Sequence, residues 1–269
     1  MKSLNLNTKK NLILILLSGV VFHSLFTTVP TKALLNITAL EIIVGGIALS
    51  ILISFPFHVL MDTVKIIKNS IQTPIDYEKD ILKLYDLSIK VKKDGLLGVS
   101  SYSDVESDIF LKDCLVLLRD YKNTASIENV IIKDIESRKM NLYKSINILK
   151  MISHVSPAFG LIGTLLGLIG LLSNMGEVNM IITNMASALV STLYGSLIAN
   201  FIATPLMGRV KNYIDNIILR YTIIKEGILS ISENNSPRDV FDKMNVMLKE
   251  DKRLAYPARR GTSYERLIS

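Results

Sequence analysis

Four long apolar segments constrain the fold of this 269-residue chain more than any other feature. A helix that crosses a bilayer needs about 20 mostly apolar residues. The apolar segments cover residues 11–26, with apolar neighbours toward Val29, and residues 37–61, 146–172 and 178–207. Lysines precede the first segment as in a signal peptide, but no small-residue cleavage site follows it, so an uncleaved helix is favoured. The sequence therefore predicts an all-α, polytopic membrane protein with four transmembrane helices.

The distribution of basic residues predicts the orientation of these helices. Of the 31 Lys and Arg residues, 30 lie in the N-terminal end, in the polar stretch between the second and third segments or in the tail. Segments rich in Lys and Arg face the cytoplasm. We therefore expect a multi-pass inner-membrane protein with both termini in the cytoplasm. This topology also accounts for the net charge of +7, so no nucleic-acid partner is expected.

The two large polar regions are expected to form helices in the cytoplasm. Apolar residues recur at spacings of three and four within DYEKDILKLYDLSIKVKK, and a helix starting near Ser126 leads without a break into the third segment. The final YPARRGTSYERLIS has no periodicity and is expected to be disordered. The expected parts are residues 1–61 with the first two transmembrane helices, 62–145 as a cytoplasmic helical domain, 146–207 as the third and fourth transmembrane helices, and 208–269 as a cytoplasmic helical segment with a disordered tail.

The residues that usually carry catalysis or bind metals are scarce and scattered. The chain has one cysteine, Cys114, within an apolar run, and three histidines that are far apart in the sequence. It has no glycine-rich loop after a strand and no nucleophile motif. We therefore expect no catalytic residues, no metal site, no cofactor and no enzyme activity.

Small residues line the third and fourth segments at helical spacing. Gly160, Gly163, Gly167 and Gly170 share a broad face of the third segment, and Ala188, Thr192, Gly195, Ala199 and Ala203 share a face of the fourth. Small residues let helices approach closely in lipid. The faces are therefore predicted to pack against other helices, and packing within one subunit would explain part of the pattern.

One threonine lies midway along each of these faces. Thr164 and Thr192 are flanked by Pro157 and Pro205, which free backbone carbonyls. Freed carbonyls are tolerated where they face protein or a water-filled path. No Asp, Glu, Lys or Arg lies centrally in any span, and Glu41, in the outer part of the second, is nearest. An ion path usually needs an ionisable group at membrane depth, so a partner helix would have to supply it.

Two motifs in these spans resemble the MotA/TolQ/ExbB proton channel family. The third span contains SPAFGLIGTLLGLIGLL and the fourth ALVSTLYGSLIANFIATPL. Two further stretches, IIVGGIALSILISFP and KEGILSISENNSPRDVFDKM, are typical of the MotA branch of the family. Four spans also fit that branch, since TolQ and ExbB have three. The resemblance covers roughly residues 37–250.

The resemblance implies a flagellar motor stator subunit. It implies a homopentamer around a pair of MotB-like helices that carry the ion-binding aspartate, with the 62–145 domain facing the rotor protein FliG. Thr164 and Thr192 match the ion-pathway positions, and Pro157 and Pro205 match the two functional prolines. Lys92 matches a basic rotor-contact residue, but Ser100 stands where a glutamate is usual, and Asp104 and Glu106 are the nearest acids that would replace it.

The residues do not decide which ion is transported or which process the ion flow drives. By resemblance, threonine at position 164 favours Na⁺ over H⁺, because two hydroxyls would help to replace the hydration water of a hard cation. The alternatives to a stator are an ExbB/TolQ-like energiser of another envelope process and a membrane scaffold that conducts nothing.

Overall fold

The computed structural model describes most of the chain beyond residue 34. The described residues are 35–72, 75–95, 97–103, 105–120, 123–173 and 176–257, with 13, 15–20, 23, 24 and 27 near the N-terminus. The first predicted span therefore lies largely outside the described residues, as does the tail from residue 258. The described chain divides into two compact units, one of residues 1–57 with 148–206 and the other of residues 58–147 with 207–269.

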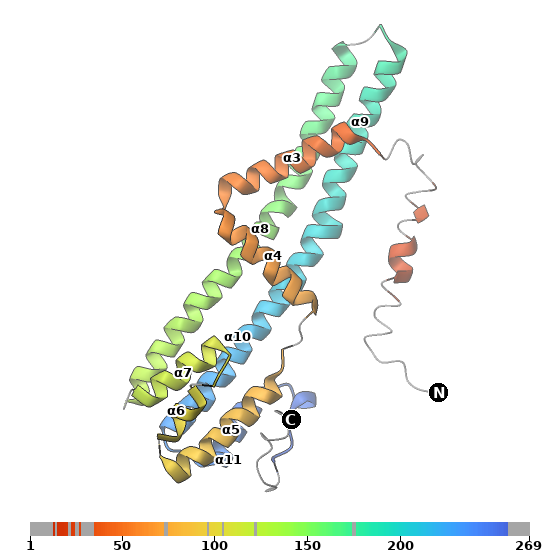
Figure 1. The fold of residues 1–269 in the computed structure, drawn as a ribbon. Helices are drawn as coiled ribbons and strands as arrows, with labels where there is room; N and C mark the ends of the chain where they lie inside the picture. Colours follow the sequence, from red (N-terminus) through yellow and green to blue (C-terminus); the bar gives the residue numbers. More distant parts are fainter. Residues whose placement is uncertain are drawn as a thin grey trace, which may run out of the picture. The chain divides into compact units, whose positions relative to one another are not determined.

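Within the described ranges the regular structure is helical, which confirms the predicted fold class. The elements are α3 (Ile37–Ser54), α4 (Phe57–Gln72), α5 (Tyr77–Asp94), α6 (Leu97–Ser103), α7 (Ile109–Asp120), α8 (Thr124–Ser173), α9 (Val178–Leu197), the π-helix η1 (Ile198–Ala203), α10 (Thr204–Ser232), α11 (Pro237–Asn245) and the short 3₁₀ helix η2 (Glu250–Lys252) (Figure 1). As predicted, the helix that starts near Ser126 continues without a break through the third apolar segment.

The second apolar segment is not one helix, which corrects its predicted extent of residues 37–61. The helix α3 stops at Ser54, Phe55 is extended (φ −131°, ψ 139°), and α4 begins at Phe57. Pro56 explains the break, because a proline disfavours the helical conformation of the residue before it. A sequence segment of continuous hydrophobicity therefore holds the end of one helix and the start of another.

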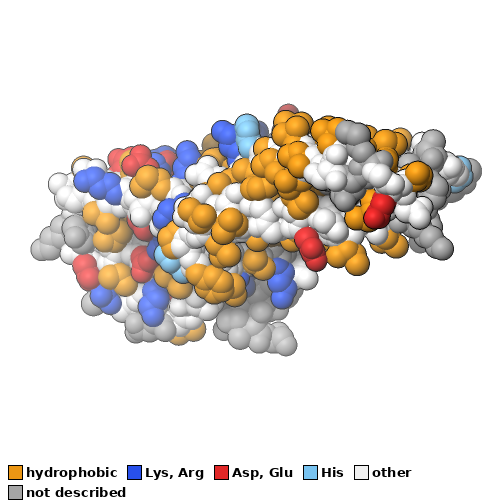
Figure 2. All heavy atoms as spheres, turned by 90° about the horizontal axis from the view of Figure 1, so that it is seen from above, with side chains coloured by type: hydrophobic (Ala, Val, Ile, Leu, Met, Phe, Trp, Pro, Cys, Tyr) orange, Lys and Arg blue, Asp and Glu red, His pale blue; other side chains and the backbone are white. Residues whose placement is uncertain are grey.

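The unit that contains α3 and α9 has the character of a membrane domain. Among the described residues, three continuous helical stretches are long and apolar enough to cross a bilayer: 37–54, 124–173 and 178–232. Many large apolar side chains on them are exposed, such as Leu161 and Leu165 of α8, and Figure 2 shows broad areas of exposed hydrophobic side chains. A soluble domain rarely exposes such areas. The count of four transmembrane helices stays a prediction.

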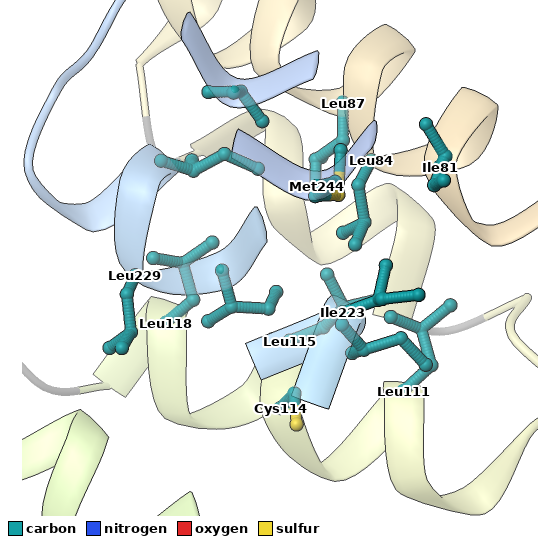
Figure 3. Packing of buried hydrophobic residues seen from close by; sticks show 14 of the residues in the cluster. Ile81, Leu84, Leu87, Leu111, Cys114, Leu115, Leu118, Ile223, Leu229 and Met244 are labelled. Carbon is teal, nitrogen blue, oxygen red and sulfur yellow. The ribbon is translucent and has the colours of Figure 1, made fainter. Parts of the chain in front are cut away.

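The other unit has a hydrophobic core of its own. It is built from α5, α7, the first half of α8, the second half of α10 and α11 (Figure 3). Gly227 of α10 lets these helices meet, because a Cβ there would lie 2.5 Å from Met244 Sδ and 2.8 Å from Leu84 Cδ1. Cys114 is buried in this core, where burial raises the pKa of its thiol, so it acts as a small apolar side chain.

Two ionic clusters tie α5 and α10 to the chain before α7. The guanidinium of Arg220 contacts both carboxylate oxygens of Asp80, at 2.5 and 3.0 Å, and Asp108 at 2.7 Å. Lys83 contacts Glu106 at 2.8 Å. Burial raises the pKa of the Asp108 and Glu106 carboxyls, but hydrogen bonds and their basic partners outweigh it, so the pKa of both is lowered. These residues therefore stay charged and hold the helices in register.

Candidate functional site: the paired helices of the membrane unit

The two predicted ion-pathway residues meet in the structure. Thr164 of α8 and Thr192 of α9 share a short hydrogen bond between their hydroxyl groups. Thr164 Oγ1 also lies 3.1 Å from the carbonyl oxygen of Gly160 and 3.2 Å from that of Ala188, and Thr192 Oγ1 lies 3.4 Å from the former. A hydroxyl has one proton and two lone pairs. The pair therefore satisfies its protons within the helix pair and keeps lone pairs for a further donor or a cation.

The exposure of these threonines decides what they can contact. Thr192 is exposed and Thr164 is half-buried, whereas their neighbours Gly163, Ser191 and Gly195 are buried. The hydroxyl pair therefore lies at the rim of the α8–α9 contact, facing outward from the chain. A polar group at this depth is expensive against lipid. The rim must then face another protein segment or water.

The small-residue faces pack against each other within one chain. An added Cβ on Gly160 would lie 3.0 Å from Ser191 O, one on Gly163 2.5 Å from Ser191 Cβ, and one on Gly167 2.6 Å from Ala188 Cβ. Ala199, also predicted to pack, is 2% exposed. Figure 1 shows α8 and α9 side by side over this stretch. The glycines thus bring the two backbones close enough for Thr164 and Thr192 to touch.

Gly195 gives the most direct test of this close approach. We expect Gly195→Ala to lower the free energy of unfolding of the purified protein in detergent by about 1–3 kcal/mol. The new Cβ would meet Ser156 O at 2.5 Å and Gly160 Cα at 3.1 Å. Backbone atoms cannot rotate away as a side chain does, so α8 and α9 must separate.

The control for this prediction is Gly208→Ala in α10, where an added Cβ meets nothing within 4 Å. Alanine favours a helix over glycine by up to about 1 kcal/mol, so this variant should be at least as stable as the wild type. Equal melting temperatures of Gly195→Ala and Gly208→Ala would show that the close approach at Gly195 is absent.

The two prolines occupy different helical settings. Pro157 lies inside α8 and is exposed, and because it has no N–H, the carbonyl of Ser153 lacks its helical donor. Pro205 is the second residue of α10, the helix that follows η1 directly. The Thr204 N–H reaches back five residues to Ala199 O, and its hydroxyl bonds to the same carbonyl at 2.8 Å. The functional role of both prolines stays a prediction.

The predicted rotor-contact residue lies in the other unit. Lys92 is exposed near the end of α5, and its Nζ donates to both the carbonyl oxygen and Oδ1 of Asn234 at 2.6 Å. Asn234 has a left-handed backbone (φ 58°) in the turn between α10 and α11. The helix α5 ends at Gly95, which also has a positive φ of 69°. Lys92 thus holds a turn and still presents a surface charge.

The structure corrects one detail of the predicted rotor contact. Glu106 was one of two acids considered as a replacement for the missing glutamate near Ser100, but it pairs with Lys83 and its side chain is only 7% exposed. It is therefore committed to the core of its own unit. Asp104, the other candidate, lies outside the described residues.

Several polar residues of the membrane unit escaped the sequence reasoning. Ser153 Oγ lies 3.1 Å from Thr204 Oγ1 and joins α8 to the start of α10. Asn200 donates its amide to Ser196 O at 3.1 Å. The π-helix η1, which contains Asn200 and ends directly before Thr204, has no clear sequence signature. The four-residue spacing of Thr192, Ser196, Asn200 and Thr204 was the available signal.

The fold and the threonine pair define a helical membrane protein with a polar contact at membrane depth. Comparison with known proteins narrows this class. Residues 102–223 match the MotA/TolQ/ExbB proton channel family. The chain is 30% identical over 216 residues to the uncharacterized protein YtxD of Bacillus subtilis, covering 80% of this chain and 79% of that protein. It is 27% identical over 219 residues to the chemotaxis protein PomA of Vibrio alginolyticus, covering 81% of this chain and 86% of that protein.

Solved structures agree with this assignment at the level of the fold. The C. jejuni MotAB structure aligns with a TM-score of 0.80 at 19% identity, over 90% of this chain and 96% of that one. The flagellar MotAB stator complex of Bacillus subtilis aligns with a TM-score of 0.78 at 22% identity, over the same shares. The chain belongs to the MotA/TolQ/ExbB proton channel family. Its relatives place it with the MotA-like stator subunits of that family, a class of membrane channel subunits and not of enzymes.

Proposed function

We propose that this chain is a flagellar stator subunit that forms a transmembrane ion channel with a MotB-like partner and converts ion flow into torque on the rotor. The observation that carries the proposal is the outward-facing hydroxyl pair of Thr164 and Thr192, in spans that contain no central acid or base. The hydroxyls supply oxygen atoms but no charge, so the partner supplies the carboxylate.

The membrane setting of the proposal follows from the distribution of charge. With 30 of 31 basic residues on one side, the unit that contains the Lys92–Asn234 contact lies in the cytoplasm and both termini are cytoplasmic. That unit would then face the rotor protein FliG, and several copies of the chain, as a homopentamer, would surround the partner helices. The similarity to the chemotaxis protein PomA and to motility protein A of Treponema pallidum favours rotation of a flagellum over an energiser of another envelope process.

The experiment that tests the channel uses cells that depend on this chain and its partner for swimming. We propose Na⁺ as the transported ion, since two hydroxyls beside a carboxylate supply several oxygen ligands at once. Replacing Na⁺ by K⁺ at a fixed proton-motive force should then stop rotation. Thr164→Ala should weaken the dependence on Na⁺. Rotation at full speed without Na⁺ would assign the proton as the ion, with the threonines serving a water chain.

The rotor contact is tested by reversing a single charge. Lys92→Glu should reduce swimming speed without reducing the amount of assembled complex, because it reverses the exposed positive charge that is proposed for the rotor contact. An exposed pair contributes only about 0–1 kcal/mol, so a reduction and not a complete loss is expected.

Lys93→Glu is the control for this reversal, because Lys93 is also exposed, at the adjacent position of α5. It should leave swimming speed near that of the wild type. If Lys92→Glu also swims normally, the rotor contact lies elsewhere on the cytoplasmic unit.

A further inference from the structure

A polar stripe continues beyond the threonine pair along the fourth span. It consists of four exposed side chains at intervals of four residues: Thr192, Ser196, Asn200 and Thr204. The residue directly before each of them is buried, as Ala199 and Ala203 show with 2% and 1% exposure. The span therefore has a packing face of small residues and, one residue further round, an exposed polar face.

The π-helix η1 keeps this stripe in line. In an α-helix, each step of four residues overshoots a full turn by about 40°, so three steps would carry the last side chain about 120° round the axis. A π-helix bonds residue i to residue i+5 and has wider turns, which reduces this drift. The Thr204 N–H bond to Ala199 O has this spacing. The π segment thus returns Asn200 and Thr204 to the side on which Thr192 lies.

The hydrogen bonds of the stripe leave acceptor atoms for a further partner. Asn200 uses its amide nitrogen toward Ser196, at 3.1 Å from the carbonyl oxygen and 3.4 Å from the hydroxyl, and within the described part of the chain its Oδ1 accepts no hydrogen bond. Thr204 Oγ1 lies 2.8 Å from Ala199 O and 3.1 Å from Ser153 Oγ, which adds a second hydroxyl from α8. Oxygen atoms with spare lone pairs therefore recur along the stripe.

Such a stripe is unfavourable against lipid. Polar groups within the bilayer face a bundle interior or a water-filled cavity. We propose that Ser196, Asn200 and the Ser153–Thr204 hydroxyl pair form the cytoplasmic half of the ion path, with Asn200 Oδ1 as the oxygen that receives the ion or its water after Thr192. This proposal rests on the proposed channel function and extends it from one pair of hydroxyls to a continuous track.

The test compares substitutions of Asn200 in the full complex of this chain with its partner, reconstituted in vesicles. Asn200→Leu keeps a similar branched shape and removes the polar atoms, whereas Asn200→Ser is smaller but polar. We expect Asn200→Leu to reduce ion flux about tenfold or more, since the ion or its water loses a hydrogen-bonding partner in transit. Asn200→Ser should keep most of the flux. If Asn200 only packs against a neighbour, Asn200→Leu should keep more ion flux than Asn200→Ser. That result would overturn the proposal.

Three further variants make the outcome specific. Thr183→Val removes a hydroxyl from the opposite side of α9, about 180° from Thr192, and should leave the flux unchanged. Thr204→Val removes a track hydroxyl at constant shape and should lower the flux even if Asn200→Leu fails to assemble. If Thr192→Val loses its flux while Asn200→Leu and Thr204→Val keep normal flux, the proposed cytoplasmic half of the path is overturned. The proposed channel function would still stand. A wild-type complex that carries no ions would overturn the channel function itself.

Discussion

Replacing Thr192 with valine will stop ion flow through the assembled complex and with it rotation. Valine has the shape of threonine, so the contact between α8 and α9, where Ser191 and Gly195 are buried, stays in place. What disappears is the hydroxyl that faces outward and bonds to Thr164. An unpaired polar group or lost oxygen ligand costs about 1–3 kcal/mol. In the proposed homopentamer this loss recurs in every copy of the chain.

The swimming speed and the ion flux of reconstituted complexes measure this effect. Thr183→Val is the matched control, because Thr183 bonds to Asn179 O on its own helix at 2.9 Å and lies on the opposite side of α9. The control should swim normally. Full rotation of the Thr192→Val variant, at wild-type levels of complex, would show that the hydroxyl pair only holds the two helices together.

Replacing Arg220 with methionine will unfold or strongly destabilise the unit of residues 58–147 and 207–269. Arg220 neutralises Asp80, whose side chain is only 5% exposed, and Asp108, which is 29% exposed. Asp108 can turn to water, but the carboxyl group of Asp80 would be left buried without its basic partner. Breaking a buried pair from one side costs about 3–5 kcal/mol, so thermal unfolding of the complex should begin at a clearly lower temperature.

Arg238→Met is the control for this loss of charge, because Arg238 lies 3.6 Å from Asp242 with side chains that are 73% and 58% exposed. A pair of this kind contributes about 0–1 kcal/mol. The pH dependence offers a second check. Since the pKa of Asp108 is lowered in the folded state, its stabilisation is present above about pH 4 and is lost as the pH falls through the folded pKa. Equal melting of Arg220→Met and Arg238→Met would contradict the ionic core.

The sequence predicted the helical membrane class well and placed Thr164 and Thr192 on the small-residue faces of their spans, because both inferences depend on local patterns. The contact between the two hydroxyls came from the structure. Hydrophobic length locates the spans, and helical spacing places Gly160, Gly163 and Gly167 on one face of α8. The packing of the small-residue face of α8 against that of α9 follows from these patterns. The glycines of α8 and Gly195 of α9 allow the close approach seen in the structure.

Other features were missed for different reasons. The break of the second apolar segment at Pro56 had a local signal in the proline itself, but continuous hydrophobicity masked it. The burial of Glu106 against Lys83 joins residues 23 positions apart, and no local pattern identifies that pairing. The π-helix η1 ends two residues before Pro205, and no local pattern identifies it. Of these features, the π-helix is the one that changes which polar groups face the proposed path.

The central claim is that this chain supplies the oxygen-lined walls of an ion path but not its charge. Ion flux should therefore be measured in vesicles that contain the chain alone, the chain with its carboxylate-bearing partner, and the chain with a partner whose carboxylate is replaced by an amide. We predict flux only in the second preparation. Equal flux from the chain alone would contradict the account, because its spans would then conduct without the acidic group that they lack.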